Sequence, residues 1–75
     1  MREDIRKILA DTFRVKLSDI TSETTIQNID TWDSLTHMEL VANLEEGLGI
    51  EFDGDEIVDM ISVSAIEKIV NGKNK

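Results

Sequence analysis

A chain of 75 residues can form one domain, residues 1–75, near the lower size at which a single hydrophobic core is stable. It contains no cysteine, which excludes disulfides and thiolate metal sites. Its net charge of −8 disfavours binding to nucleic acid, because nucleic-acid affinity depends on neutralising phosphates with lysine and arginine. Hydrophobic residues make up 40% of the chain and recur with a helical period, which also disfavours disorder.

The N-terminal sequence has neither the apolar run nor the small-residue cleavage site of a secretory signal. No apolar run approaches the length needed to span a membrane. We therefore expect a soluble, cytoplasmic and monomeric protein that does not associate with membranes.

The charge is distributed very unevenly along the chain. All eight lysines and arginines lie near the two ends, whereas residues 17–67 hold thirteen aspartates and glutamates and no basic residue. Such a segment repels nucleic acid and attracts basic protein surfaces. Solubility alone is an equally good explanation of the acidic charge.

The apolar spacing predicts an all-α fold, a small four-helix bundle with a long loop between the first two helices. The first helix is expected over residues 2–15. Residues 16–33 form a polar connection with isolated apolar side chains, which we expect to anchor the loop across the bundle. These anchors are Leu17, Ile20, Ile26, Ile29 and Trp32.

The second helix is expected over residues 34–47. Asp33 is a good N-cap, because its carboxylate can accept hydrogen bonds from the free N–H groups of the first turn. Gly47 and Gly49 supply the stop signal.

A short third helix is expected over residues 55–61 and a fourth over residues 63–71. The fourth helix has two possible starts: Ser62 could cap it directly, or Ser64 and Glu67 could form a capping box. Gly72 sits where a helix-ending residue belongs, and residues 73–75 should be a frayed tail. The apolar residues expected in the core here are Ile57, Met60, Ile61, Val63, Ile66, Ile69 and Val70.

On a helical wheel the second helix divides into three strips. The core strip holds Leu40, Val41, Leu44 and Leu48, and the polar strip holds Thr36, Glu39, Asn43 and Glu46. A second apolar strip, separated from the core by Glu45, holds Leu35, Met38 and Ala42; we call it the docking strip.

The docking strip has two explanations. The apolar arc could simply be wide and pack against two neighbouring helices. Alternatively, it could meet partner proteins, with Glu39, Glu45 and Glu46 as a charged rim, since an apolar centre with a charged rim is typical of transient interfaces. We favour the second explanation because the docking strip begins one residue after Ser34, where backbone N–H groups would stabilise an added phosphate.

Asp33-Ser34-Leu35, followed by Met38-Glu39-Leu40-Val41 and Leu44-Glu45-Glu46, resembles the acyl carrier protein family. The resemblance extends over nearly the whole chain. It implies that Ser34 receives 4′-phosphopantetheine from coenzyme A through a phosphopantetheinyl transferase, with Asp33 as the adjacent motif residue. The thiol of that group would carry acyl or aminoacyl thioesters between enzymes that load, transfer or condense them, and the protein would need no catalytic residues of its own.

The sequence also departs from the pattern of fatty-acid carriers. Thr31-Trp32 replaces a small pair before Asp-Ser, and Thr36 and Gly47 stand where acidic residues are frequent. These departures favour a stand-alone carrier of a specialised pathway, and fatty acid and polyketide biosynthesis both remain open. Trp32 is expected to anchor the loop against the bundle, with a role in partner recognition as the alternative.

Two other groups of residues resemble functional sites. His37 lies three residues after Ser34, but a serine and a histidine on one helix lack an orienting group and an oxyanion hole. We therefore expect His37 to be either a partly buried wall residue or a lip near the acyl chain. The acidic run from Asp53 fails the EF-hand template at the positions of Val58 and Ser64, and no metal site is expected. The remaining alternative is an acidic adaptor that binds basic proteins through the second helix and is never modified.

Overall fold

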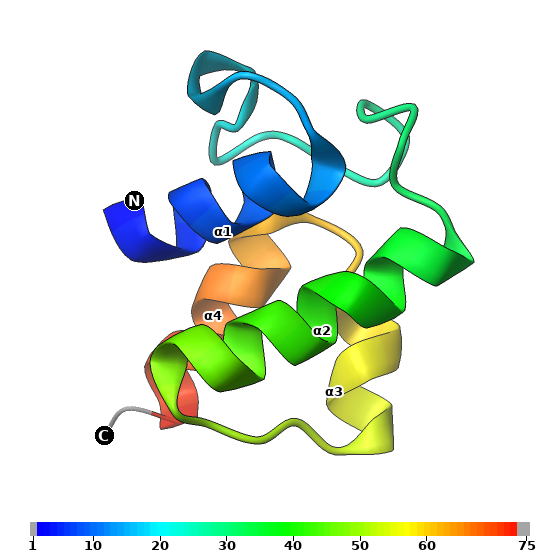
Figure 1. Cartoon of the computed structure of the whole chain (residues 1–75). Helices are drawn as coiled ribbons and strands as arrows, with labels where there is room; N and C mark the ends of the chain where they lie inside the picture. The colour runs from blue at the N-terminus through cyan, green and yellow to red at the C-terminus, as the bar shows by residue number, and fades with distance from the viewer. Residues whose placement is uncertain (1, 74–75) are drawn as a thin grey trace.

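The computed structural model describes residues 2–73. Its elements are α1 (Glu3–Phe13), the 3-10 helix η1 (Leu17–Asp19), α2 (Ser34–Leu48), α3 (Gly54–Asp59) and α4 (Val63–Lys73). The predicted all-α fold, with a long connection between its first two helices and a short third helix, is therefore confirmed (Figure 1). No helix among residues 2–73 is both long enough and apolar enough to cross a membrane.

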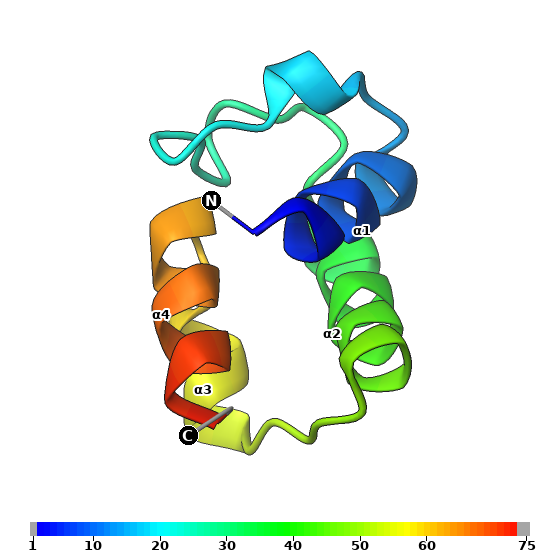
Figure 2. The ribbon, with the colours of Figure 1, turned by 90° about the vertical axis from the view of Figure 1, so that its left-hand side faces the viewer.

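The helices form two layers around one core. Figure 2 shows α1 and α2 together on one side and α3 and α4 on the other. The connection before α2 crosses the end of the bundle at which α4 begins, where Ile26 N donates to Ile61 O at 2.9 Å and Val63 N donates to Thr24 O at 2.9 Å. These bonds tie the loop to the start of α4.

The core is filled from α1, α2 and α4, from the loop before α2, and from Met60 in the connection between α3 and α4. Its buried apolar side chains are Ile5, Leu9, Ala10, Phe13, Ile20, Ile29, Trp32, Leu40, Val41, Leu44, Met60, Val63, Ile66 and Val70. The predicted core strip of α2 is confirmed, with Leu48 partly buried against the same cluster. Burial of this apolar surface is what stabilises so small a domain.

Four of the five predicted loop anchors pack onto the bundle, three of them fully and Ile26 partly. The prediction was wrong for Leu17, which is 36% exposed, because the single turn of η1 places none of its side chains in the core. A polar side chain takes part instead: Thr24 is buried, and its hydroxyl accepts from Thr21 N and donates to Asp19 O.

The ends of α1 and α2 differ from the predicted positions. Helix α1 ends at Phe13, and Arg14 adopts a left-handed conformation with φ of 58°. Gly47 lies inside α2, so only Gly49 acts as the stop, with φ of 67° and its N–H bonded to Glu45 O. Gly47 allows α1 and α2 to approach closely, since a Cβ there would lie 3.0 Å from Ile8 Cδ1.

The second half of the chain also required corrections. Helix α3 is shorter than predicted, and Ile61, which follows it, is 53% exposed instead of buried. Ser62 caps α4 directly, since Ser62 Oγ accepts from Ala65 N at 3.1 Å.

The end of α4 extends beyond its predicted stop. Gly72 lies within the helix, and Lys73, predicted to be frayed, is its last residue. Lys73 is held because its Nζ lies 2.6 Å from Glu56 Oε1 and 5.6 Å from the centre of the Phe52 ring. The rest of the predicted frayed tail, residues 74–75, lies outside the described residues.

Candidate functional site

Ser34 is the first residue of α2 and is exposed. The residue before it is the N-cap, as predicted: Asp33 Oδ1 accepts from Thr36 N at 2.9 Å, and Thr36 Oγ1 accepts from Asp33 N at 2.9 Å. This reciprocal pair is a capping box, with threonine in the position that glutamate or glutamine usually fills. It fixes the backbone on which Ser34 is mounted.

The electrostatics of this helix start have two contributions. The backbone N–H of Thr36 is the main cause that lowers the pKa of Asp33 below its usual range, so the carboxylate is ionised at neutral pH. The free N–H groups and the dipole of α2 favour negative charge at the same end. A phosphate on Ser34 Oγ would be stabilised by the N-terminal end of the α2 dipole, although the nearby Asp33 carboxylate would repel it.

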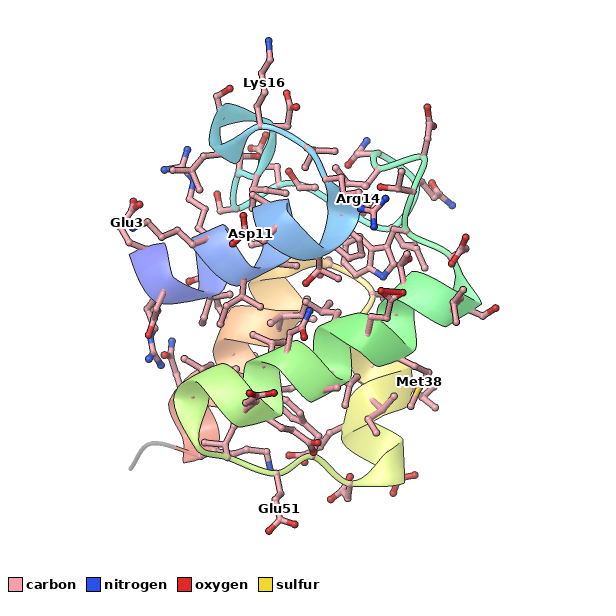
Figure 3. The ribbon with its side chains drawn as sticks, in the orientation of Figure 1. Glu3, Asp11, Arg14, Lys16, Met38 and Glu51 are labelled. Atoms are coloured by element: carbon pink, nitrogen blue, oxygen red, sulfur yellow. The ribbon has the colours of Figure 1, made fainter. Side chains whose placement is uncertain are left out.

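An open apolar pocket of about 400 Å³ lies beside Ser34. It is bounded by the start of α2, the loop and α3, and its lining residues are Ile26, Asp33, Ser34, His37, Met38, Ile57, Val58 and Ile61. Figure 3 shows Met38 on α2 next to the α3 ribbon. A group attached to Ser34 would therefore find an apolar surface within reach.

His37 is half-buried and forms part of the wall of this pocket, as the sequence predicted. Its Nδ1 lies 3.0 Å from Trp32 Nε1, and its Nε2 lies 2.8 Å from Ile57 O. Both ring nitrogens are thus engaged away from Ser34, and no Ser34–His37 nucleophilic pair is formed. Trp32 is buried and stacks on Phe13, with 4.7 Å between the ring centroids, which confirms its role as a loop anchor.

The sequence model of the phosphopantetheine attachment site matches residues 3–70. The chain belongs to the acyl carrier protein family. Its cofactor is 4′-phosphopantetheine, attached covalently, and its partners are a phosphopantetheinyl transferase and enzymes that handle acyl groups. Domains of this family are generally carriers and not catalysts. None of the curated proteins compared with the chain matches it significantly.

The residues at the start of α2 fit the prosthetic group of this carrier protein. The match includes Ser34, an exposed hydroxyl at a helix N-terminus with an apolar pocket beside it. Because the chain contains no cysteine, a thiol for thioester chemistry can only come from the attached group.

The docking strip of the carrier lies on the surface. Leu35 is 71% exposed, Met38 is 54% exposed and Ala42 is exposed, so the explanation of the docking strip as a wide core arc is wrong. Glu39 and Glu46 are also exposed.

Glu45 has a second task that the sequence did not reveal. It is half-buried, and its Oε2 accepts from Phe52 N at 2.9 Å. This contact ties the connection after α2 back to the helix.

Sequence reasoning missed the contribution of α3. Val58 is 72% exposed, and it lines the pocket together with Ile57 and Ile61. The signal was an apolar cluster in a helix too short to bury all of it, but Ile57 and Ile61 were assigned to the core and Val58 was given no role in a site. These side chains face the same pocket as Met38.

The acidic residues near α3 serve the carrier's fold. Asp53 Oδ1 accepts from Glu56 N and Glu56 Oε1 accepts from Asp53 N, a capping box that begins α3. The Lys73 ammonium, bonded to the Glu56 carboxylate, lowers the pKa of Glu56. Among residues 2–73, no three histidine, aspartate or glutamate side chains are grouped so as to hold a metal ion.

Proposed function

We propose that Ser34 is the residue to which 4′-phosphopantetheine is attached, and that the protein carries acyl or aminoacyl groups as thioesters on that arm. The observation that supports this most strongly is the exposed position of Ser34 at the capped start of α2, next to an apolar pocket. The Asp33-Ser34-Leu35 motif lies within the matched part of the chain.

Attachment forms a phosphodiester between Ser34 Oγ and the pantetheine phosphate of coenzyme A. The pyrophosphate bond of coenzyme A breaks, adenosine 3′,5′-bisphosphate leaves, and the serine proton passes to the transferase. The bound group then supplies a thiol that forms and exchanges thioesters. The residues of this chain orient that arm: Asp33 and Thr36 fix the helix start, and the pocket offers apolar surface to whatever the arm carries.

The proposed partner surface consists of the docking strip with Glu39, Glu45 and Glu46 at its edge. Its apolar centre and acidic rim suit enzymes with a basic surface around an apolar contact. Met38 adapts its shape easily, which suits several partners. The exposed Val58 and Ile61 extend this surface onto α3.

We propose that the carrier serves a specialised pathway in the cytoplasm and acts as a monomer. Two of the departures from the fatty-acid pattern have structural roles in this chain. Trp32 anchors the loop, and Thr36 is the capping partner of Asp33. Fatty acid and polyketide pathways use the same arm, so the cargo is set by the loading enzyme.

The intact mass of the purified protein tests this proposal. After incubation with coenzyme A and a promiscuous phosphopantetheinyl transferase, the wild type should gain the mass of one phosphopantetheinyl group. Ser34→Ala should gain nothing, whereas Ser64→Ala, which changes another exposed serine near the start of a helix, should gain the full mass. Unchanged wild-type mass would instead favour the unmodified adaptor.

A further inference from the structure

The hydrogen bonds of His37 define its protonation state. The indole N–H of Trp32 can only donate, so the Nδ1 atom that it meets at 3.0 Å must carry a lone pair. The carbonyl of Ile57 can only accept, so the Nε2 atom 2.8 Å from it must carry the proton. The planes of the two rings differ by 19°, which is compatible with a hydrogen bond between their ring nitrogens. The geometry thus needs a neutral imidazole in its Nε2–H form.

This chain of hydrogen bonds joins three parts of the fold. Trp32 belongs to the loop and is fixed by burial and by its stacking on Phe13 of α1. His37 lies in the first turns of α2, and Ile57 lies in α3. His37 therefore connects α3 to the rigid side of the bundle.

Helix α3 has few other attachments. None of its six residues, all within the described part of the chain, is fully buried, and Ile57 is only partly buried. Its start is held by its capping box and by the partly buried Glu56–Lys73 ion pair. A short helix with so little buried surface is easily displaced, since local stability follows buried apolar contact.

The position of α3 also determines the pocket beside Ser34, since Ile57 and Val58 of α3, and Ile61 just after it, supply one of its walls. We propose that His37 is a positioning residue that latches α3 against the start of α2, and that this latch closes only while the imidazole is neutral. The latch is a property of the unmodified protein. Only its effect on a group attached at Ser34 rests on the proposed function.

Protonation of His37 would place a second N–H on Nδ1, directly opposite the Trp32 N–H. Two donors 3.0 Å apart repel, and the buried indole N–H loses its acceptor. The imidazole must then turn or shift, which also changes its contact with Ile57 O. Histidine is the side chain that ordinarily changes charge between about pH 5 and pH 8.

No other group that lines the pocket would explain a change in the position of α3 as the pH is lowered. Asp33, the other titratable residue among those that line this pocket, remains ionised because the Thr36 N–H lowers its pKa. The loop and α3 present Ile26, Ile57 and Val58 to the pocket, and the acidic residues of α3 do not line it. Phe13 and Trp32 do not titrate.

Nuclear magnetic resonance on the ¹⁵N-labelled, unmodified protein tests the latch. His37 is the sole histidine and Trp32 the sole tryptophan, so their ring signals are unambiguous. At about pH 8 the imidazole should be in the Nε2–H form. As the pH is lowered, the Trp32 indole signal and the amide protection factors of residues 57–61 should change together with the signals of the His37 ring. The protection factors should fall about two- to tenfold.

Two variants test the hydrogen bond to Ile57 and the hydrogen bond to Trp32 separately. His37→Gln can reach Ile57 O as a donor and cannot titrate, so α3 protection should persist at both pH values. His37→Asn can offer Trp32 an acceptor but is too short for Ile57, so α3 protection should be low at both.

The wild-type titration alone decides the matter if a variant fails to fold. An Nδ1–H tautomer, or α3 protection that is unchanged while His37 titrates, would overturn the proposal. Neither result bears on whether Ser34 is modified, which the mass experiment tests separately.

Discussion

Asp33 and Thr36 satisfy each other's backbone N–H groups at the start of α2, and the exposed serine stands between them in the sequence. A capped helix start presents Ser34 in one fixed backbone conformation to an incoming enzyme. Fixed geometry lowers the entropy lost on binding. The cap is therefore part of the proposed recognition, although neither side chain needs to react.

The cap gives a pH dependence that can be predicted. Because the folded pKa of Asp33 is lowered, its contribution is fully present above the usual carboxyl value of 3.8 and is lost as the pH falls through the lower folded value. The amide signal of Thr36 should report this loss. Asp33→Asn caps without a charge and should remove the pH dependence, whereas Asp33→Ala should lower the melting temperature at neutral pH. An Ala variant as stable as the wild type would contradict the assignment of the cap.

Arg14 is the second residue whose backbone makes a specific prediction. Its φ of 58° is unfavourable for any residue with a Cβ, whereas glycine adopts it freely. Arg14→Gly should therefore raise the free energy of unfolding by about 0.5–1 kcal/mol, measured by urea denaturation. Arg14→Ala removes the same charge without relieving the backbone and serves as the control; equal stability of the two variants would show that the backbone is not strained.

At the scale of elements, α2 combines a buried face with an exposed one. Leu40, Val41 and Leu44 hold it in the core, while the docking strip remains at the surface with two of its three rim glutamates. A single helix thus mounts Ser34 and presents the surface beside it. Helix α3 supplies the opposite wall of the pocket.

The acidic rim should act in partner binding through Glu39 and Glu46. Reversing either charge to lysine should weaken transferase binding about two- to tenfold at low salt, with a smaller effect at high salt. Glu45 is a poorer probe because its carboxylate also holds Phe52 N.

Glu51→Lys makes the same charge change away from the start of α2, where Figure 3 shows Glu51 beyond the end of the helix, and is the matched control. Surface plasmon resonance would measure the affinities. Equal losses in all three variants would indicate net charge instead of a docking rim.

The helices themselves were largely predictable, because α1, α2 and α4 each bury a regular apolar stripe. The errors have identifiable physical causes. Gly47 was predicted to end α2, but it lies inside the helix, where it packs close to Ile8 of α1. Gly72 was predicted to end α4, but the helix continues to Lys73, which is held by its ion pair with Glu56. Ile61 was assigned to the core because a short apolar cluster does not reveal which of its faces is buried.

The site was predictable in part for a similar reason. Asp33 as a cap and the exposed docking strip follow from residues close together in sequence. The walls from Val58 and Ile61 and the bond from His37 to Ile57 join segments far apart in sequence. Periodicity along one helix cannot reveal such contacts.

At the scale of the whole molecule, the charge imbalance should affect both the stability of the fold and the proposed binding of partners. Residues 17–67 carry thirteen acidic groups and no basic one, within a chain of only 75 residues. Lys73 of α4 offsets part of this charge at Glu56. The remaining repulsion favours basic partners and opposes folding.

Screening of the acidic side chains by added salt should therefore stabilise the fold. Raising sodium chloride from about 10 mM to about 0.5 M should raise the melting temperature, followed by circular dichroism. A Glu23→Gln and Glu51→Gln double variant removes two exposed charges and should melt higher in low salt while responding less to added salt. A midpoint independent of salt would contradict this view of the surface.

The central claim is that Ser34 carries the prosthetic group, and tandem mass spectrometry tests it most directly. Because residues 17–67 contain no lysine or arginine, a protease that cuts after acidic residues is needed; cleavage after Asp33 and Glu39 isolates residues 34–39. After loading from coenzyme A, we predict that the phosphopantetheinyl mass is found on Ser34 of this peptide. The same mass on Thr36, or on any peptide without Ser34, would contradict the account.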